Sequence, residues 1–309
     1  MKPAILITGG AGFIGNNLTR FLLSQGERVI VIDNFISSKR DKISDLLNHS
    51  NFTLWEGDIC EDDIFDGFQY KIKQIYHLAC PASPPKYQAH PLKTIDTCVN
   101  GTINILDFAK RENCPILFTS TSEVYGESLV TPQPETYRGN VNTIGIRACY
   151  DEGKRLAETI MFEYHRQFGV DIKVVRIFNT YGPYMDEDDG RIVTNFIKQV
   201  RDDKDITIYG TGKQTRSFCF VNDLIRGLIL MMASPHTGPI NLGNPNEMSI
   251  FEIAWKISKI FGKELKIKYL PLPQDDPTHR CPDITLAKTL LGWEPTIYID
   301  DGLKKTINC

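Results

Sequence analysis

Tyr150 and Lys154 stand four positions apart, near the start of a helix-like stretch. On a helix this spacing puts both side chains on one face. We expect the lysine ammonium to lower the pKa of the phenol, so that Tyr150 could take a proton from an alcohol near neutral pH. Tyr-x-x-x-Lys is also a common chance pattern, so its interpretation depends on the surrounding segments.

An earlier strand-like run ends in the hydroxyl residues Thr119, Ser120, Thr121 and Ser122, followed by Glu123. A hydroxyl there could hold the substrate oxygen that Tyr150 deprotonates. A carboxylate at the buried carboxyl end of a strand is either a structural group with hydrogen-bonded partners or part of a reactive site. We favour the catalytic role for Glu123.

Glycines 9, 12 and 15 lie where a strand-like run, Ala4–Thr8, passes into a helix-like one, Ile14–Gln25. Glycines at this place allow a tight turn, let backbone N–H groups approach a pyrophosphate and bring the helix close to the strand. The phosphates would then lie at the positive end of the helix dipole. This context predicts a dinucleotide site at Gly9, Gly12 and Gly15.

Asp33 ends the second strand-like run and predicts which dinucleotide binds. A carboxylate there can accept hydrogen bonds from both ribose hydroxyls of the adenosine and repels a 2′-phosphate, which favours NAD over NADP. The alternative is an aspartate that only begins a turn before Asn34, and Lys39 and Arg40 keep NADP open. Asp58, after the third strand-like run, is placed to face the adenine, although a turn aspartate would look the same.

Strand-like and helix-like segments alternate over the first half of the chain. The strand-like runs are Ala4–Thr8, Arg28–Ile32, Phe52–Glu56, Ile75–Ala79, Pro115–Thr119 and Asp171–Ile177. The helix-like stretches include Ile14–Gln25, Leu92–Arg111 and Ala148–Phe168. Continuous apolar strands that alternate with helices predict an α/β fold with a doubly wound parallel sheet of Rossmann type, covered on both faces.

The pattern changes after residue 178, where loops rich in glycine, proline and aspartate separate shorter elements. We expect residues 1–178 to form the dinucleotide-binding domain, with a later return near 213–243. Residues 179–212 and 244–309 would form a smaller C-terminal substrate-binding lobe over the carboxyl edge of the sheet, where such sheets bind ligands.

The composition excludes several classes of protein. The 309 residues are 41% hydrophobic and 24% charged, and 35 basic against 38 acidic residues leave a net charge of −3, so no nucleic-acid partner is expected. No apolar run reaches the ~18 residues of a membrane span and no signal peptide precedes the first strand, so we expect a cytoplasmic protein with no membrane contact. The 8 cysteines include no Cys-x-x-Cys pair, which argues against a zinc site or a disulfide framework.

Three motifs together resemble the extended short-chain dehydrogenase/reductase family, whose members rework nucleotide sugars: TGGAGFIG (8–15), STSEVYG (120–126) and the Tyr150–Lys154 pair. Within that family the chain is most similar to the UDP-glucuronic acid decarboxylases. The similar segments run nearly end to end and include ACPASPPKY (79–87), CYDEGKRLAET (149–159), RIFNTYGPYM (176–185), IYGTGKQTRSF (208–218) and DDPTHRCPDI (275–284).

The resemblance implies NAD-dependent conversion of UDP-glucuronic acid to UDP-xylose and CO2 through a UDP-4-keto intermediate, with NAD regenerated in each cycle. Tyr150, aided by Lys154, would take the proton of the sugar 4-hydroxyl while C4 gives up a hydride. Thr121 would hold O4. The other implied catalytic residues are Ser122 and Glu123, which would face the carbon that carries the carboxylate, and Arg280, which would lie near the sugar and phosphates and help to protonate C5.

The resemblance also implies two sets of binding residues, and no metal. The cofactor-binding residues would be Gly9, Gly12, Phe13, Ile14, Gly15, Asp33, Asn34, Phe35, Asp58, Ile59, Leu78, Ala79, Thr119, Tyr150, Lys154 and Thr180. The substrate-binding residues would be Ser83, Asn179, Arg191, Val193, Asn195, Phe196, Tyr209, Arg216 and Arg280. Arginines suit the diphosphate because of their charge and fixed fork geometry.

Related activities remain as alternatives. Nucleotide-sugar 4,6-dehydratases typically read Thr-Asp-Glu where this chain has Thr121-Ser122-Glu123, and 4-epimerases usually lack the glutamate. A catalytically silent NAD-sensing protein commonly loses the Tyr or the Lys of the active pair, and both are present here. Two positions depart from the decarboxylases, because Asp96 stands for the usual Lys and Cys98 for the usual Asn.

Members of this family are generally homodimers that pair two long helices per subunit in a four-helix bundle. The resemblance therefore implies a homodimer here, with Leu92–Arg111 and Ala148–Phe168 as the paired helices. The apolar residues expected to be available for the contact are Ile103, Leu106, Ile160 and Phe162.

Overall fold

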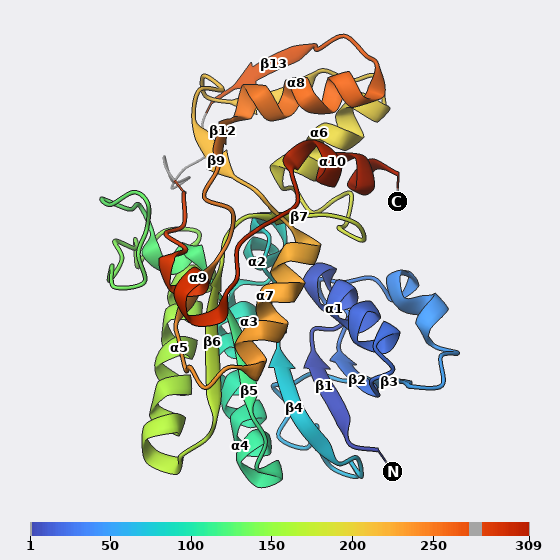
Figure 1. Ribbon diagram of the computed structural model, residues 1–309, viewed down its shortest axis with the longest axis vertical. Coiled ribbons are helices and arrows are strands. Elements are labelled where there is room, and N and C mark those ends of the chain that lie inside the picture. The colour runs from blue at the N-terminus through green and yellow to red at the C-terminus, as the bar shows by residue number, and fades with distance from the viewer. Residues whose placement is uncertain (1, 272–279, 309) are drawn as a thin grey trace.

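The computed structural model describes residues 2–271 and 280–308, and its central feature is a seven-stranded parallel sheet (Figure 1). The strands lie in the order β11-β6-β5-β4-β1-β2-β3. Their bounds are β1 (Ala4–Thr8), β2 (Val29–Asp33), β3 (Phe52–Glu56), β4 (Ile72–His77), β5 (Ile116–Thr121), β6 (Ile172–Ile177) and β11 (Ile240–Leu242). The prediction of a doubly wound α/β fold is confirmed, and β11 is the strand of this sheet that no sequence pattern predicts.

Apolar side chains fill both faces of the sheet, which is why its strands are continuous apolar runs. Every residue of β1, β2 and β5 is buried. Helices α1 (Phe13–Ser24) and α7 (Val221–Ala233) cover one face, and α4 (Thr102–Glu112) and α5 (Ala148–Phe168) cover the other (Figure 1). Because the strands are parallel, their carboxyl ends meet at one edge, and the loops that leave this edge carry the predicted site residues.

The stretch predicted as one helix, Leu92–Arg111, is interrupted. Helix α3 (Pro91–Asp96) passes into a π turn at Thr97–Gly101 before α4 begins. The hydroxyls of Thr94 and Thr97 donate to backbone carbonyls one turn earlier, at 2.9 and 2.8 Å. Threonine hydrogen bonds of this kind bend helices. The π turn contacts α5, the helix that carries the predicted catalytic pair.

A smaller lobe lies over the carboxyl edge of the sheet (Figure 1). Its elements are α6 (Ile192–Arg201), β8 (Ile206–Tyr209), β9 (Thr215–Ser217), β12 (Glu247–Ser249), α8 (Ile250–Phe261), β13 (Ile267–Leu270) and α10 (Ile299–Ile307). β8 pairs with β13 in parallel, and β9 pairs with β12 in antiparallel fashion. Helix α8 begins at a capping box in which Ser249 and Glu252 exchange hydrogen bonds, which stabilises its first turn.

The sheet and the lobe are interleaved along the chain. α7 and β11 return to the sheet, and α9 (Thr285–Leu291) packs against both although it lies in the range predicted for the lobe. The carboxylate of Asp223 on α7 accepts the N–H groups of Thr296 and Ile297 at 2.9 and 2.8 Å, which fixes this crossing. The exact domain boundaries stay a prediction. Three short elements complete the description: α2 (Pro84–Ala89), β7 (Thr180–Tyr181) and β10 (Cys219–Phe220).

The helix surface predicted as a dimer contact is only partly available. Leu106 is completely buried against the sheet, so its predicted place in that contact is wrong. Ile103, Ile160 and Phe162 are half-buried, whereas Leu156 on α5 is exposed. The four-helix bundle itself stays a prediction. Within the described residues, the helices are all too short or too polar to cross a membrane.

Candidate active site

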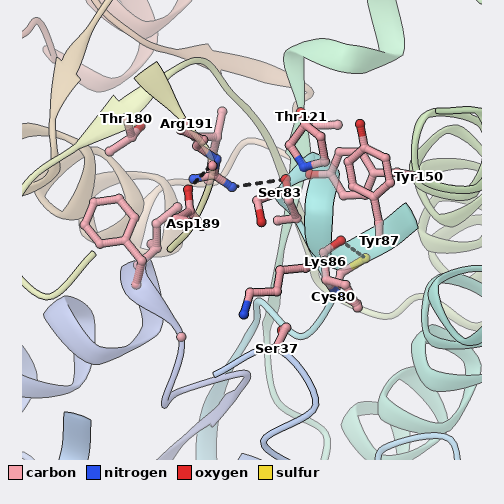
Figure 2. Close-up of a pocket in the computed structure, with 18 of the residues that line it drawn as sticks. Ser37, Cys80, Ser83, Lys86, Tyr87, Thr121, Tyr150, Thr180, Asp189 and Arg191 are labelled. Carbon is pink, nitrogen blue, oxygen red and sulfur yellow. Dashed lines mark hydrogen bonds and ion pairs between the residues drawn. The ribbon is translucent and has the colours of Figure 1, made fainter. Parts of the chain in front are cut away.

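A cavity of about 570 Å³ lies between the carboxyl edge of the sheet and the lobe. Cavities of this size commonly hold small-molecule ligands. Every predicted site residue lines it except Phe35. Figure 2 shows Tyr87 and Tyr150 on one side of the cavity, with Arg191 and Thr180 on the other. The structure therefore brings together residues from loops that are far apart in the sequence.

The turn between β1 and α1 is too tightly packed for side chains. A Cβ added at Gly9 would lie 2.8 Å from backbone atoms of Ala79, and one at Gly15 would collide with the Gly9 carbonyl oxygen. Gly12 is the N-cap of α1, so no side chain covers the first N–H groups of the helix. N–H groups at a helix N-terminus bind phosphate, so this turn fits the pyrophosphate of a dinucleotide.

Asp33 lies at the end of β2 and lines the cavity. Its Oδ2 accepts the Ala11 N–H at 2.9 Å, and its Oδ1 accepts the Phe35 N–H at 2.9 Å and the Ser38 hydroxyl at 2.8 Å. Burial raises the pKa of Asp33, and these hydrogen bonds oppose the rise. The carboxylate is thus fixed where a dinucleotide ribose would bind. Phe35 supports it through a backbone contact and does not line the cavity.

Lys93 joins two carboxylates near the predicted adenine end of the cavity. Its Nζ lies 2.9 Å from Asp58 Oδ2 and 2.7 Å from Asp96 Oδ2. Asn34 donates to the same Asp58 oxygen at 2.9 Å. Burial alone would raise the pKa of Asp58, but hydrogen bonds from the Cys60 N–H and from Lys93 lower it. Asp58 is therefore an anchored anion, and Asp96 helps to hold its lysine.

Tyr150 and Lys154 lie on the buried face of α5, as their spacing predicts. The Tyr150 ring stacks on Tyr87, with ring centroids 5.1 Å apart and an interplanar angle of 3° (Figure 2). The Lys154 ammonium donates to the Thr119 carbonyl at the end of β5, at 2.9 Å. The stacked ring joins α5 to α2 (Pro84–Ala89), and the lysine contact joins it to the end of β5.

The pKa of Tyr150 differs from the sequence expectation. Burial raises it well above its usual value, and a hydrogen bond with Thr121 and the charge of Arg191 only partly oppose this. The predicted lowering of this pKa by Lys154 is therefore wrong, because the ammonium is directed to the Thr119 carbonyl and burial outweighs nearby charge. The hydrogen bond does place the Tyr150 hydroxyl beside Thr121, as the predicted role for both residues requires.

Glu123 lies in a short 3₁₀ turn, Ser122–Tyr125, directly after β5, and two arginines contact it. Arg280 forms a forked pair with both carboxylate oxygens, with one of its contacts at 2.7 Å, and Arg147 Nη2 lies 2.7 Å from Oε2. Burial alone would raise the pKa of Glu123, but the two guanidinium charges lower it to about 2. Glu123 therefore remains ionised at neutral pH. We call Glu123, Arg147 and Arg280 the arginine clamp.

Asp151 lies beside the clamp and is 7% exposed. Its Oδ2 is 4.0 Å from Arg147 Nε, and its buried Oδ1 has no hydrogen-bond partner in the described part of the chain. Burial and the charge of Glu123 raise the pKa of Asp151 to about 7, against the opposing charge of Arg147. A carboxyl group that exchanges a proton near neutral pH thus lies behind Tyr150, and such groups cluster at functional sites.

Arg191 stands on the lobe side of the cavity, at the N-cap of α6. Its Nη2 donates to the Ala82 carbonyl at 3.0 Å and its Nε lies 3.2 Å from Asp189 Oδ2 (Figure 2). These contacts connect the lobe to the loop after β4. The neighbouring Ser83 hydroxyl is buried and has no hydrogen-bond partner among the residues described, so it is available to a ligand.

The other predicted substrate residues line the lobe wall. Val193 and Phe196 on α6 are each 3% exposed, and Arg216 on β9 is also buried. Tyr209 at the end of β8 is 43% exposed, so its ring can cover a ligand that enters from solvent. Asn179 and Asn195 complete this set. The binding roles of these residues stay predictions.

Comparison with known proteins identifies the family. The family model for GDP-mannose 4,6-dehydratase matches residues 6–306. The chain is 50% identical to UDP-glucuronic acid decarboxylase 4 of Arabidopsis thaliana over 97% of its own length and 66% of that protein, and 50% identical to decarboxylase 5 over 97% and 86%. The chain belongs to the UDP-glucuronic acid decarboxylase family.

A solved structure of a different enzyme shares the fold of this decarboxylase family member. The UDP-glucuronic acid 4-epimerase from Bacillus cereus, in complex with UDP-glucuronic acid and NAD, matches with a TM-score of 0.86 and 29% identity over 99% of this chain and 98% of that one. The fold thus serves more than one reaction, so the reaction must be argued from the residues of the site.

The sequence analysis of this decarboxylase family member misses two cavity residues, Tyr87 and Arg147, and also Asp151 beside the clamp. Two signals could have indicated them. A buried Glu123 requires cationic partners, and Asp151 adjoins Tyr150. The chain has many arginines, however. The resemblance indicates Arg280, but only the fold selects Arg147 and shows that both arginines contact Glu123. Of the DDPTHRCPDI segment that resembles the decarboxylases, residues 275–279 lie outside the described residues.

Proposed function

We propose that this chain converts UDP-glucuronic acid to UDP-xylose and CO2 with bound NAD. One observation carries the proposal: a glycine turn that fits a dinucleotide, a Tyr150–Thr121 pair and the arginine clamp all line one cavity. A hydride acceptor, a base for a sugar hydroxyl and a cationic place for a carboxylate are what this reaction needs.

The chain's own residues are suited to hold NAD. Gly9, Gly12 and Gly15 would cradle the pyrophosphate, Asp33 would bind the adenosine ribose and Asp58 would face the adenine. NAD, when bound, accepts the hydride from C4 of the sugar and later returns it. Lys154 would stand beside the nicotinamide ribose.

Tyr150 and Thr121 would act on the sugar 4-hydroxyl. Thr121 holds this oxygen while Tyr150 removes its proton, which needs a phenolate that the buried ring does not form by itself. A ligand hydroxyl in contact with both groups would supply a hydrogen bond that stabilises the phenolate. The ketone that results at C4 is β to the carboxylate, which allows CO2 to leave.

The arginine clamp favours decarboxylation over dehydration. A 4,6-dehydratase needs an acid to expel the 6-hydroxyl, and Ser122 is not one. Glu123 is not one either, because its pKa of about 2 keeps it ionised. The guanidinium groups of Arg147 and Arg280 line the cavity and are suited to bind the carboxylate of UDP-glucuronic acid, because guanidinium–carboxylate pairs are strong charge-assisted contacts.

The test is to incubate the purified chain with UDP-glucuronic acid and catalytic NAD and to follow the nucleotide sugars by proton NMR. We expect UDP-xylose without net NADH. UDP-galacturonic acid would instead indicate a 4-epimerase, and conversion of UDP-glucose or dTDP-glucose with UDP-glucuronic acid untouched would indicate a 4,6-dehydratase. Bound NAD without turnover of any of these sugars would indicate a silent NAD-sensing protein. Tyr150→Phe should abolish turnover, whereas Tyr164→Phe, on the same helix but hydrogen-bonded to Asp107, should not.

We also propose that two copies of the chain pair through α3 and α5. Leu92 and Ile95 on α3 and Leu156 on α5 are 79%, 41% and 47% exposed, and the two helices contact each other. A second copy would bury this apolar surface, consistent with the bundle that the family resemblance implies. Sedimentation of the wild type and of Leu156→Glu tests it, with a dimer expected only for the wild type.

A further inference from the structure

Two cysteine thiols meet at the wall of the cavity. The Sγ atoms of Cys80, in the loop after β4, and Cys98, in the π turn, are 3.5 Å apart. Cys80 lines the cavity, whereas Cys98 is 2% exposed. Cys98 is one of the two departures from the decarboxylase pattern, so the pair is a feature of this chain and not of the reaction.

The surroundings favour a shared proton between the two sulfurs. The hydrogen bond from Cys80 lowers the pKa of Cys98, burial opposes this, and the Lys154 charge adds to the lowering. The same contact with Cys98 and burial raise the pKa of Cys80. The thiolate therefore forms more readily on Cys98, and it can pass to Cys80 by transfer of one proton across the contact.

We propose that Cys80 and Cys98 are a modification site for hydroperoxide oxidants, which link them in a disulfide and thereby slow the enzyme. Cys80 meets the peroxide in the cavity: its thiolate attacks one oxygen, the O–O bond breaks, and a sulfenic acid and hydroxide form. The Cys98 sulfur then attacks Cys80, the S–O bond breaks, and water leaves with the Cys98 proton. Two sulfurs lose two electrons, and the peroxide gains them.

The link would act on α5 through Gly153. A Cβ at Gly153 would lie 3.2 Å from both Cβ and Sγ of Cys98, so the cysteine already packs directly on the helix backbone. A disulfide requires the sulfurs to approach to about 2.05 Å, which shifts the Cys98 sulfur from its place against Gly153. Gly153 precedes Lys154, so the movement would disturb the helix turn that carries Tyr150 and Lys154.

The experiment treats the purified full-length protein, with NAD present, with hydrogen peroxide, and then alkylates the remaining thiols. Trypsin should yield residues 74–86 linked to residues 94–110, and dithiothreitol should separate them. We expect the UDP-xylose rate to fall at least tenfold as the link forms and to recover on reduction. The mass of the linked peptide is read without any activity, so a failure of the proposed function would not hide the outcome.

Cysteine variants distinguish the effect of the Cys80–Cys98 link from the effect of oxidation at other residues. Cys98→Ser and Cys98→Ala should keep the activity of the reduced protein and lose most of its sensitivity to peroxide. Cys149→Ser is the matched control, because Cys149 contacts the Tyr87 carbonyl at 3.9 Å and should leave the link intact. The absence of the linked peptide, an unchanged rate once it has formed, or equal inhibition of the Cys98 variants would overturn the proposal.

Discussion

Two carboxylate–arginine groups, one within α5 and β6 and the other at the N-terminal end of α5, differ in what they do. In one, Arg176 on β6 holds both oxygens of Glu158 on α5, at 2.7 and 2.9 Å. Arg176 also donates to the Tyr125 hydroxyl at 3.1 Å and to the Glu135 carbonyl at 3.0 Å, and the Ser120 hydroxyl donates to Glu158. We call Glu158 and Arg176 the buried pair. The other group is the arginine clamp.

The difference lies in charge and exposure to the cavity. The buried pair is neutral, is saturated by hydrogen bonds and lies away from the cavity lining. The clamp has two guanidinium groups for one carboxylate, and all three of its members line the cavity. A neutral, saturated pair can do no more than join α5 to the sheet, whereas guanidinium groups that line the cavity can bind an anion that enters it. Burial of a charged residue is therefore not by itself a sign of catalysis.

The clamp is tested most severely by Glu123→Gln. The variant keeps the shape of the side chain but removes the negative charge that the two arginines surround. The arginines would then rearrange, and the substrate carboxylate would meet a site of altered geometry. We expect kcat to fall by about 10²-fold, because displaced groups beside the reacting atoms can cost that much, with little change in the far-UV circular dichroism. Initial rates of UDP-xylose formation measure this. A rate within threefold of the wild type would remove Glu123 from the mechanism.

The buried pair is tested by Glu158→Gln. It leaves the Arg176 charge buried without its counterion, which should lower the free energy of unfolding by about 3–5 kcal/mol. Urea denaturation measures the loss. Because the pair lies outside the cavity, kcat per folded molecule should stay within about twofold. A large fall in kcat without loss of stability would contradict the view that the buried pair is structural and only the clamp is functional.

Asp151→Asn tests the proton-exchanging carboxyl beside the clamp. The folded pKa of about 7 lies above the unfolded value of about 4. The folded state therefore binds the Asp151 proton more tightly than the unfolded state does. The stabilisation that this gives is fully present below pH 4 and is lost as the pH rises to 7. Relative to the wild type, the free energy of unfolding of the variant should rise by about 1.4 kcal/mol for each pH unit in that interval. Urea denaturation of both proteins at pH 5, 6 and 7 measures the gain, and parallel curves would contradict it.

Arg147→Lys should give the smallest effect. The lysine keeps the positive charge but cannot keep the geometry of the guanidinium contact with Glu123. Loss of one hydrogen bond to a charged group is worth about 1.5 kcal/mol, or roughly a tenfold fall in kcat. Steady-state rates at saturating substrate measure it. Arg155→Lys is the control and should change kcat little, because Arg155 lies on α5, is partly exposed and donates to the backbone carbonyls of Val124 and Arg138.

The sequence predicts much of the fold because its strands are continuous apolar runs and its glycine turn is sharply placed. Prediction from the sequence fails where tertiary contacts determine the local structure. β11 is only three residues long and has no pattern of its own, and the π turn within the predicted helix depends on packing against α5. Motifs predict most of the residues that line the cavity. They do not predict the pKa of Tyr150 or the pairing of Glu123, since both follow from burial. Arg147 and Asp151 acquire their roles from neighbours that are distant in sequence.

β11 is translated well after β6, the strand with which it pairs, and this order has a consequence for synthesis of the protein. β6 ends at Ile177, but the strand that covers its edge begins only at Ile240. At the usual ribosomal rate of about 5–20 residues per second, the nascent chain would expose the unpaired edge of β6 for several seconds. An uncovered strand edge can pair with another chain. Expression of this protein should therefore benefit from slower growth or from added chaperones, more than its folded surface would suggest.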